Sequence, residues 1–128
     1  MTKQALFTDK APAPIGPYSQ AVKVSCGTMI FVSGQGAVDP QTGEIVGDTA
    51  AEQAEVTLKN LQTIITAAGA KMANVVKTTV FLKSMDDFKP VNEVYARYFS
   101  EPYPARAAVE AARLPKDILV EIEAILMV

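Results

Sequence analysis

The 128-residue sequence contains no histidine and only one cysteine, Cys26. Without histidine the chain cannot form a Ser-His-Asp triad, and with one cysteine it cannot form a His/Cys zinc site. No clustered Asp/Glu motif supports a magnesium or calcium site either. A single cysteine also excludes a disulfide bond within the chain, which fits a reducing compartment. We therefore expect any chemistry to proceed without a metal.

The sequence also lacks a long apolar run. No segment approaches the length that a membrane-spanning helix needs, and residues 1–10 lack the apolar core of a signal peptide. We therefore expect a cytoplasmic protein that does not contact a membrane. The net charge of −2 and the pI near 5.1 give no broad attraction to phosphate backbones, which counts against nucleic acid as the main partner.

The composition that is present is typical of a soluble globular protein, with 49% apolar and 20% charged residues. A chain of this length suits one domain, which we expect to span residues 1–128.

Residues 104–125 read as two apolar strands joined by a polar turn at 113–117. Side chains alternate between the two faces of a strand, so Arg106 and Ala108 share one face of the first strand. The second strand carries an unbroken apolar face, which leaves Glu121 and Glu123 on the opposite face.

Arg106 is the unusual residue in this strand pair, because burying a guanidinium is costly unless something anionic meets it. Charge pairing alone favours a structural ion pair with Glu110, Glu121 or Glu123. The alternative is that the planar guanidinium binds the carboxylate of a substrate. One of the two glutamates at 121 and 123 is a candidate acid or base, since two close carboxylates would repel.

The remaining pattern predicts three strands, a helix, a strand, a helix and then the pair at 104–125. The earlier strands are expected near residues 5–8, 19–25, 29–33 and 75–83, and the helices near 49–69 and from 86 onward. Residues 9–18 hold three prolines and a glycine and are expected to form an extended loop. This order indicates one sheet with two helices packed on a single face.

Residues 29–33 are apolar on both faces and are predicted to form a central strand. If both helices cover one face of the sheet, the other face still carries apolar residues that something must cover. Another copy of the chain is the simplest candidate, so the sequence predicts self-association.

The sequence pattern alone does not assign a site role to three further residues. Tyr18 fits packing and a pocket hydroxyl equally well, whereas Asn92, early in a helix, is by default a surface residue. Cys26 stands beside a turn glycine and is interpreted as a small buried filler rather than a nucleophile.

Several segments together resemble one family, the RidA/YjgF reactive-intermediate deaminases. The resemblance runs from about residue 5 to the C-terminus. The matching motifs, in order, are Ile15-Gly-Pro-Tyr-Ser-Gln-Ala21, Val32-Ser-Gly-Gln35, Val75-Val-Lys-Thr-Thr-Val-Phe81, Val91-Asn-Glu-Val-Tyr95, Pro104-Ala-Arg-Ala-Ala-Val109, Leu114-Pro-Lys116 and Val120-Glu-Ile-Glu-Ala124.

The resemblance implies an α+β fold like that of chorismate mutase, with a single mixed sheet and two helices on one face. It also implies a homotrimer with sites between subunits. The implied reaction is cofactor-free hydrolysis of 2-enamine and 2-imine acids, such as 2-aminoacrylate and 2-iminobutanoate, to 2-keto acids and ammonia. Pyridoxal-phosphate enzymes supply these intermediates.

Two other activities compete with this one. The first is a non-catalytic binding or regulatory protein that holds small carboxylates in the same cleft. The second is RNA cleavage or inhibition of translation, which the acidic pI and the absence of histidine disfavour.

The resemblance also assigns roles to individual residues. It implies that Arg106 binds the substrate carboxylate and that Glu121 handles protons near the attacking water. Glu110 and Glu123 are then left as structural charges. The implied substrate-binding residues are Tyr18, Ser33, Gly34, Asn92, Arg106 and Ala108, the last standing where some members carry a cysteine.

Overall fold

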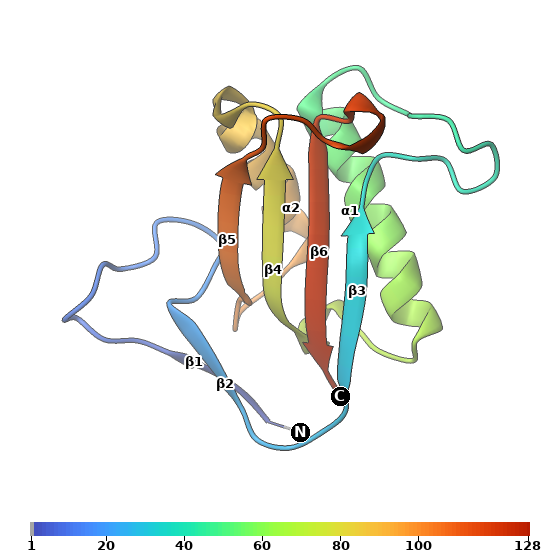
Figure 1. Cartoon of the computed structure of the whole chain (residues 1–128). Coiled ribbons are helices and arrows are strands. Elements are labelled where there is room, and N and C mark those ends of the chain that lie inside the picture. The colour runs from blue at the N-terminus through green and yellow to red at the C-terminus, as the bar shows by residue number, and fades with distance from the viewer. Residues whose placement is uncertain (1) are drawn as a thin grey trace.

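The computed structural model describes residues 2–128, and their element order is the one that the sequence predicts (Figure 1). The elements are β1 (Lys3–Leu6), β2 (Ala21–Val24), β3 (Met29–Gln35), α1 (Ala50–Ala67), β4 (Val75–Leu82), α2 (Phe88–Tyr98), β5 (Ala105–Glu110) and β6 (Val120–Met127). Short 3-10 turns lie at Met72–Asn74, Met85–Asp87 and Pro115–Asp117. No helix within residues 2–128 has the length and apolar character to cross a membrane.

The main sheet has the strand order β3-β6-β4-β5. Strands β4 and β5 are parallel, whereas β6 is antiparallel to both of its neighbours, so the sheet is mixed. Both helices lie behind this sheet in Figure 1 and pack against the same face. The predicted α+β architecture, with a mixed sheet and two helices on one face, is confirmed.

The prediction that all strands join a single sheet is wrong. Strands β1 and β2 pair only with each other, as a separate antiparallel ribbon. Thr28 exchanges backbone hydrogen bonds with Val128, which joins the chain to β6 just before β3 begins. An isolated bridge between Ser19 and Ala105 links the segment before β2 to the main sheet.

The two strands within residues 104–125 are not neighbours either, because β4 lies between them. Helix α2 carries the chain from β4 to the parallel strand β5 at the edge of the sheet. The chain then crosses the end of β4, where Ala111 N–H donates to Leu82 O and Lys83 N–H donates to Leu119 O. It returns as β6, which lies between β3 and β4. Strand β4 therefore separates β5 from β6.

Helix α1 begins where the sequence predicts. The Thr49 hydroxyl accepts a hydrogen bond from Glu52 N–H at 3.2 Å, and the Glu52 carboxylate accepts one from Asp48 N–H at 2.8 Å. These bonds satisfy backbone donors that have no partner inside the helix. At the other end Gly69 adopts a φ of +77°, the left-handed conformation that commonly follows a helix. A stripe that includes Leu58 and Leu61 is buried against the sheet.

Strand β3 lies at the edge of the sheet, so its predicted central position is wrong. Its helix-facing residue Val32 is buried, but Met29 and Phe31 on the outer face are 50% and 69% exposed. A central strand is apolar on both faces because both are covered, whereas within residues 2–128 the outer face of β3 has no cover. Cys26, in the turn before β3, is exposed rather than buried.

Strand β6 shows the predicted alternation of faces. Val120, Ile122, Ala124 and Leu126 are at most 2% exposed and belong to the core beneath the helices. Glu121 and Glu123 therefore face the other side, away from the helices.

Candidate functional site

Arg106 is half-buried and lies among aromatic rings rather than carboxylates. Its Nη1 donates a 2.6 Å hydrogen bond to Asn92 Oδ1. Its Cζ lies 4.8 Å, 5.2 Å and 5.6 Å from the ring centroids of Tyr95, Tyr18 and Phe88. We call these three rings and the Asn92 amide the arginine cage.

The ion pairs found in residues 2–128 join Arg97 to Glu55 and Arg113 to Asp117, and neither involves Arg106. The reading of Arg106 as a structural ion pair within this chain is therefore wrong. Glu110, one of its supposed partners, instead accepts a hydrogen bond from Met85 N–H. The guanidinium is thus left with hydrogen-bonding capacity for an anion, since one amide oxygen uses one of its five N–H donors.

The cage is assembled from three parts of the chain. Phe88, Asn92 and Tyr95 follow one another on α2 at spacings of four and three, which places them on one face of the helix. Arg106 pairs in register with Thr78 on β4, so both side chains face α2. Tyr18 comes from the proline-rich loop, where its hydroxyl accepts a 3.3 Å hydrogen bond from the backbone of Ile15.

Burial lowers the pKa of the Arg106 guanidinium from its ordinary value, and the Coulombic influence of Tyr95 and Tyr18 partly opposes this. The side chain stays charged at neutral pH, because an arginine starts from a very high pKa. A partly desolvated charge over aromatic faces attracts an incoming anion more strongly than one in bulk water.

Ala108 lies beyond Arg106 on the same face of β5. The space that Ala108 shares with Arg106, Asn92 and the rings of α2 is only about 10 Å³. That is room for about one water molecule. An organic acid would therefore reach the guanidinium from its exposed side.

Gly16 borders the exposed side of the cage. A Cβ atom placed on Gly16 would lie 3.5 Å from Arg106 Nη2 and 3.4 Å from Asn92 Nδ2. The absence of a side chain at this position keeps one edge of the guanidinium open.

A second group of predicted site residues, Ser33, Gly34 and Glu121, lies on the other side of the sheet. Ser33 and Gly34 are exposed at the end of β3, and Glu121 on the neighbouring β6 is half-buried. A Cβ atom on Gly34 would collide with Glu121 Oε2. Glycine at position 34 therefore lets the glutamate carboxylate lie against the backbone of β3.

The two groups do not meet within one chain. Tyr18, Asn92, Arg106 and Ala108 lie together on the helix side at the β5 edge. Ser33, Gly34 and Glu121 lie together at the β3–β6 side, where Glu121 pairs in register with Phe81 on the outer face of β4. The predicted residues thus form two separate half-sites.

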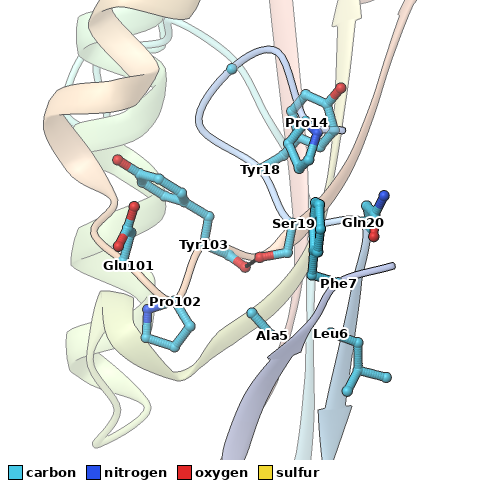
Figure 2. Close-up of a pocket in the computed structure, with 11 residues that line it drawn as sticks. Ala5, Leu6, Phe7, Pro14, Tyr18, Ser19, Gln20, Glu101, Pro102 and Tyr103 are labelled. Carbon is cyan, nitrogen blue, oxygen red and sulfur yellow. Dashed lines mark hydrogen bonds between the residues drawn. The ribbon is translucent and has the colours of Figure 1, made fainter. Parts of the chain in front are cut away.

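A larger cavity of about 580 Å³ adjoins the cage between the β1–β2 ribbon and the segment before β5 (Figure 2). Gly16 and Tyr18 line this cavity as well as bordering Arg106. Much of its remaining wall is apolar, and Figure 2 shows Glu101 and Tyr103 on the side opposite the ribbon. The ribbon is held to this wall by the Ser19 hydroxyl, which donates to the Tyr103 carbonyl oxygen.

The sequence pattern assigned Phe88 and Tyr95 no role at the site, and their contact with Arg106 is seen only in the structure. The available signal was their spacing from Asn92, which puts all three on one helical face. Gly16 likewise stood out only as part of a loop motif.

Within residues 2–128 no three His, Cys, Asp or Glu side chains gather in a way that could hold a metal ion.

Comparison with known proteins gives a family match over almost the whole chain. Residues 8–128 match the family described as Endoribonuclease L-PSP. A RutC family protein from Pyrococcus abyssi is 55% identical over 98% of this chain and 97% of its own length. The human protein named 2-iminobutanoate/2-iminopropanoate deaminase is 48% identical over 98% of this chain and 90% of its own.

Solved structures agree with these sequence matches. The crystal structure of RidA from an Antarctic Psychrobacter bacterium is 49% identical, with a TM-score of 0.76, and the match covers 98% of this chain and 99% of that one. That of E. coli TdcF with bound serine is 45% identical, with a TM-score of 0.74 and 98% coverage of both chains.

Proposed function

This chain belongs to the RidA/YjgF/L-PSP family, and we propose that it is an enzyme that hydrolyses reactive 2-imino and 2-enamino acids to 2-keto acids and ammonia. The proposed substrates are 2-aminoacrylate and 2-iminobutanoate, released by pyridoxal-phosphate enzymes. The human relative named as an imine deaminase and the serine bound to TdcF support a small amino-acid-like ligand.

The observation that carries the proposal is the state of Arg106. It is a half-buried guanidinium held by one amide and three rings, and no carboxylate within residues 2–128 pairs with it. A planar guanidinium suits the two oxygens of a substrate carboxylate. We assign Arg106 to that carboxylate, with Tyr18, Asn92 and Ala108 as the neighbouring binding residues.

The second half-site supplies the chemistry in this proposal. We assign Glu121 to take a proton from water, and the adjacent Ser33–Gly34 backbone at the end of β3 to supply polar groups beside it. Since the half-sites lie on opposite faces of one chain, we propose that Arg106 of one copy meets Ser33, Gly34 and Glu121 of another. A homotrimer with sites between subunits provides this arrangement.

The reaction needs little more than positioning, because an imine of a 2-keto acid is already electrophilic at C2. The oxygen of water bonds to C2, and the proton lost by the water passes through Glu121 to the nitrogen. The resulting carbinolamine then breaks its C2–N bond. Its hydroxyl proton leaves with the nitrogen as ammonia, and the carbonyl of the 2-keto acid remains.

The proposal is tested by adding the purified protein to threonine dehydratase that is turning over threonine or serine, with the dehydratase in excess. Release of 2-keto acid should accelerate with the wild-type chain and not with Arg106→Ala. Arg113→Ala is the matched control, because that arginine is highly exposed and pairs with Asp117 away from the cage. Its acceleration should equal that of the wild type.

Unchanged keto-acid release with the wild-type chain would overturn the enzymatic proposal. If 2-oxobutanoate then still raised the melting temperature, the chain would be a binding protein for small carboxylates. Equal activity of Arg106→Ala and the wild type would remove Arg106 from its assigned role. An RNA-cleavage assay in low salt covers the remaining alternative.

A further inference from the structure

We propose that Tyr95, held by a hydrogen bond to Thr78, is a positioning residue that fixes the Arg106 guanidinium for carboxylate binding. This inference rests on the proposed function, because it presupposes that Arg106 binds the carboxylate of the ligand. It adds two residues from the core that no sequence motif had assigned to the site.

The first observation is a buried hydrogen bond. The hydroxyls of Thr78 and Tyr95 lie 2.8 Å apart, and the two residues are 1% and 0% exposed. Both hydroxyls would be unsatisfied without each other, which makes this bond costly to break. It joins β4 to α2 beneath the β5 edge of the sheet.

The second observation is the way this bond orients the ring. Thr78 is the register partner of Arg106 on the adjacent strand, and the Tyr95 centroid is the nearest of the three rings to Arg106 Cζ, at 4.8 Å. A hydroxyl anchored to β4 fixes the plane and depth of the ring. The ring in turn limits where the guanidinium on β5 can lie.

The third observation is that Tyr95 is braced from a second direction. Its ring stacks on Phe99, with centroids 4.3 Å apart and an interplanar angle of 29°. Phe99 contributes to the same core, but the rings found around Arg106 within residues 2–128 are those of Tyr18, Phe88 and Tyr95. Tyr95 therefore both packs in this pair and contacts the guanidinium, whereas Phe99 only packs.

Tyr95 is the most deeply buried member of the cage. It is 0% exposed, whereas Tyr18, Phe88 and Asn92 are only half-buried, and Tyr18 comes from a loop. A pre-set guanidinium loses less conformational freedom when a ligand binds. The expected benefit is tighter binding of carboxylates in particular.

The test compares binding of 2-oxobutanoate, which has a carboxylate, with 2-oxobutanamide, which does not. We expect Tyr95→Phe and Thr78→Val each to weaken 2-oxobutanoate binding about threefold to tenfold, since each removes the same hydrogen bond. The double variant should be no weaker than either single one. Tyr95→Leu, which also removes the ring, should weaken binding by about tenfold or more. Binding of the amide should change little in all of them.

Phe99→Leu is the matched control, because it disrupts the same stacked pair without removing a ring from the cage. It should lower thermal stability and leave 2-oxobutanoate affinity within about twofold of the wild type. Equal losses of affinity in Phe99→Leu and Tyr95→Leu, or parallel losses for acid and amide, would show a merely structural role and overturn the inference.

A second readout needs no ligand and covers the case in which Tyr95→Leu does not fold. The Arg106 Nε–H resonance should carry a ring-current shift that changes in Thr78→Val and Tyr95→Phe. If neither the resonance nor the affinity changes in those variants, while Arg106→Ala still loses 2-oxobutanoate binding, the role of Tyr95 and Thr78 is overturned. The proposed function then stands. If the wild-type chain does not bind 2-oxobutanoate, or Arg106→Ala binds it equally well, the proposed carboxylate clamp fails as well.

Discussion

Arg106 and Glu121 lie on opposite faces of the four-stranded sheet, with β4 between their strands. Arg106 pairs with Thr78 and faces α2, whereas Glu121 pairs with Phe81 and faces away from both helices. A side chain cannot reach through a packed sheet to the other face. If both residues serve one reaction, they must come from two copies of the chain.

This relationship predicts complementation between inactive variants. Arg106→Ala and Glu121→Gln should each lose the acceleration of keto-acid release. When the two chains are unfolded, mixed equally and refolded into the proposed trimers, about one site in four receives both intact residues, so about a quarter of wild-type activity should return. No recovery, despite mixed oligomers seen by mass spectrometry, would show that Arg106 and Glu121 do not serve one shared site.

The bare outer face of β3 predicts where the copies meet. Phe31 is 69% exposed and Met29 beside it on the same face is 50% exposed, and an exposed apolar patch of this kind marks an interaction surface. Phe31→Ser should shift sedimentation from the proposed trimer toward monomer and reduce activity in parallel. Ile64→Ser, on the solvent side of α1 at 38% exposure, is the control and should sediment like the wild type.

The contact between Gly34 and Glu121 predicts a strong effect from one methyl group. Gly34→Ala places a Cβ into the Glu121 carboxylate, so the carboxylate must move. We expect at least a tenfold loss of activity but little loss of stability in urea unfolding, because the end of the flexible Glu121 side chain can move aside. Gly34→Ala/Glu121→Ala should be no less active than Glu121→Ala alone, because the collision acts only through Glu121. Additive effects of the two substitutions would contradict this explanation.

Tyr95 predicts a loss of stability in alkali. Burial raises the pKa of its phenol from 10.0 to about 12, against the opposing effects of Thr78 and Arg106. A pKa raised by folding means that the folded state holds the proton more tightly, so this contribution is complete below about pH 10 and is lost as the pH rises toward 12. Urea unfolding of Tyr95→Phe should therefore depend less on pH in this range than that of the wild type. Equal pH dependence of the wild type and Tyr95→Phe would exclude Tyr95 as a source of this loss of stability.

The sequence by itself determined most of the local structure and the family. Period-two alternation placed the apolar face of β6 against the helices and left Glu121 opposite it, and the helix predicted from near residue 49 does begin there as α1. These features depend on neighbouring residues, so local chemistry is enough to predict them. The order of the motifs likewise identified the family that the comparisons show.

The tertiary structure decided which segments became neighbours. The sequence suggested one sheet and placed residues 29–33 at its centre, but β1 and β2 form their own ribbon and β3 lies at an edge. Strand order depends on which long-range pairings form. A strand that is apolar on both faces also gives the same sequence pattern whether its second face is covered by the same chain or by another copy.

The surroundings of Arg106 were also decided by the tertiary structure. The sequence could show that an arginine stood in an apolar strand, but charge pairing suggested Glu110, Glu121 or Glu123 as its partner. Only the fold places β4 between Arg106 and Glu121, and puts Tyr95 and Asn92 of α2 beside the guanidinium. The partner of a buried charge is set by which side chains share its face of the sheet, and packing determines that.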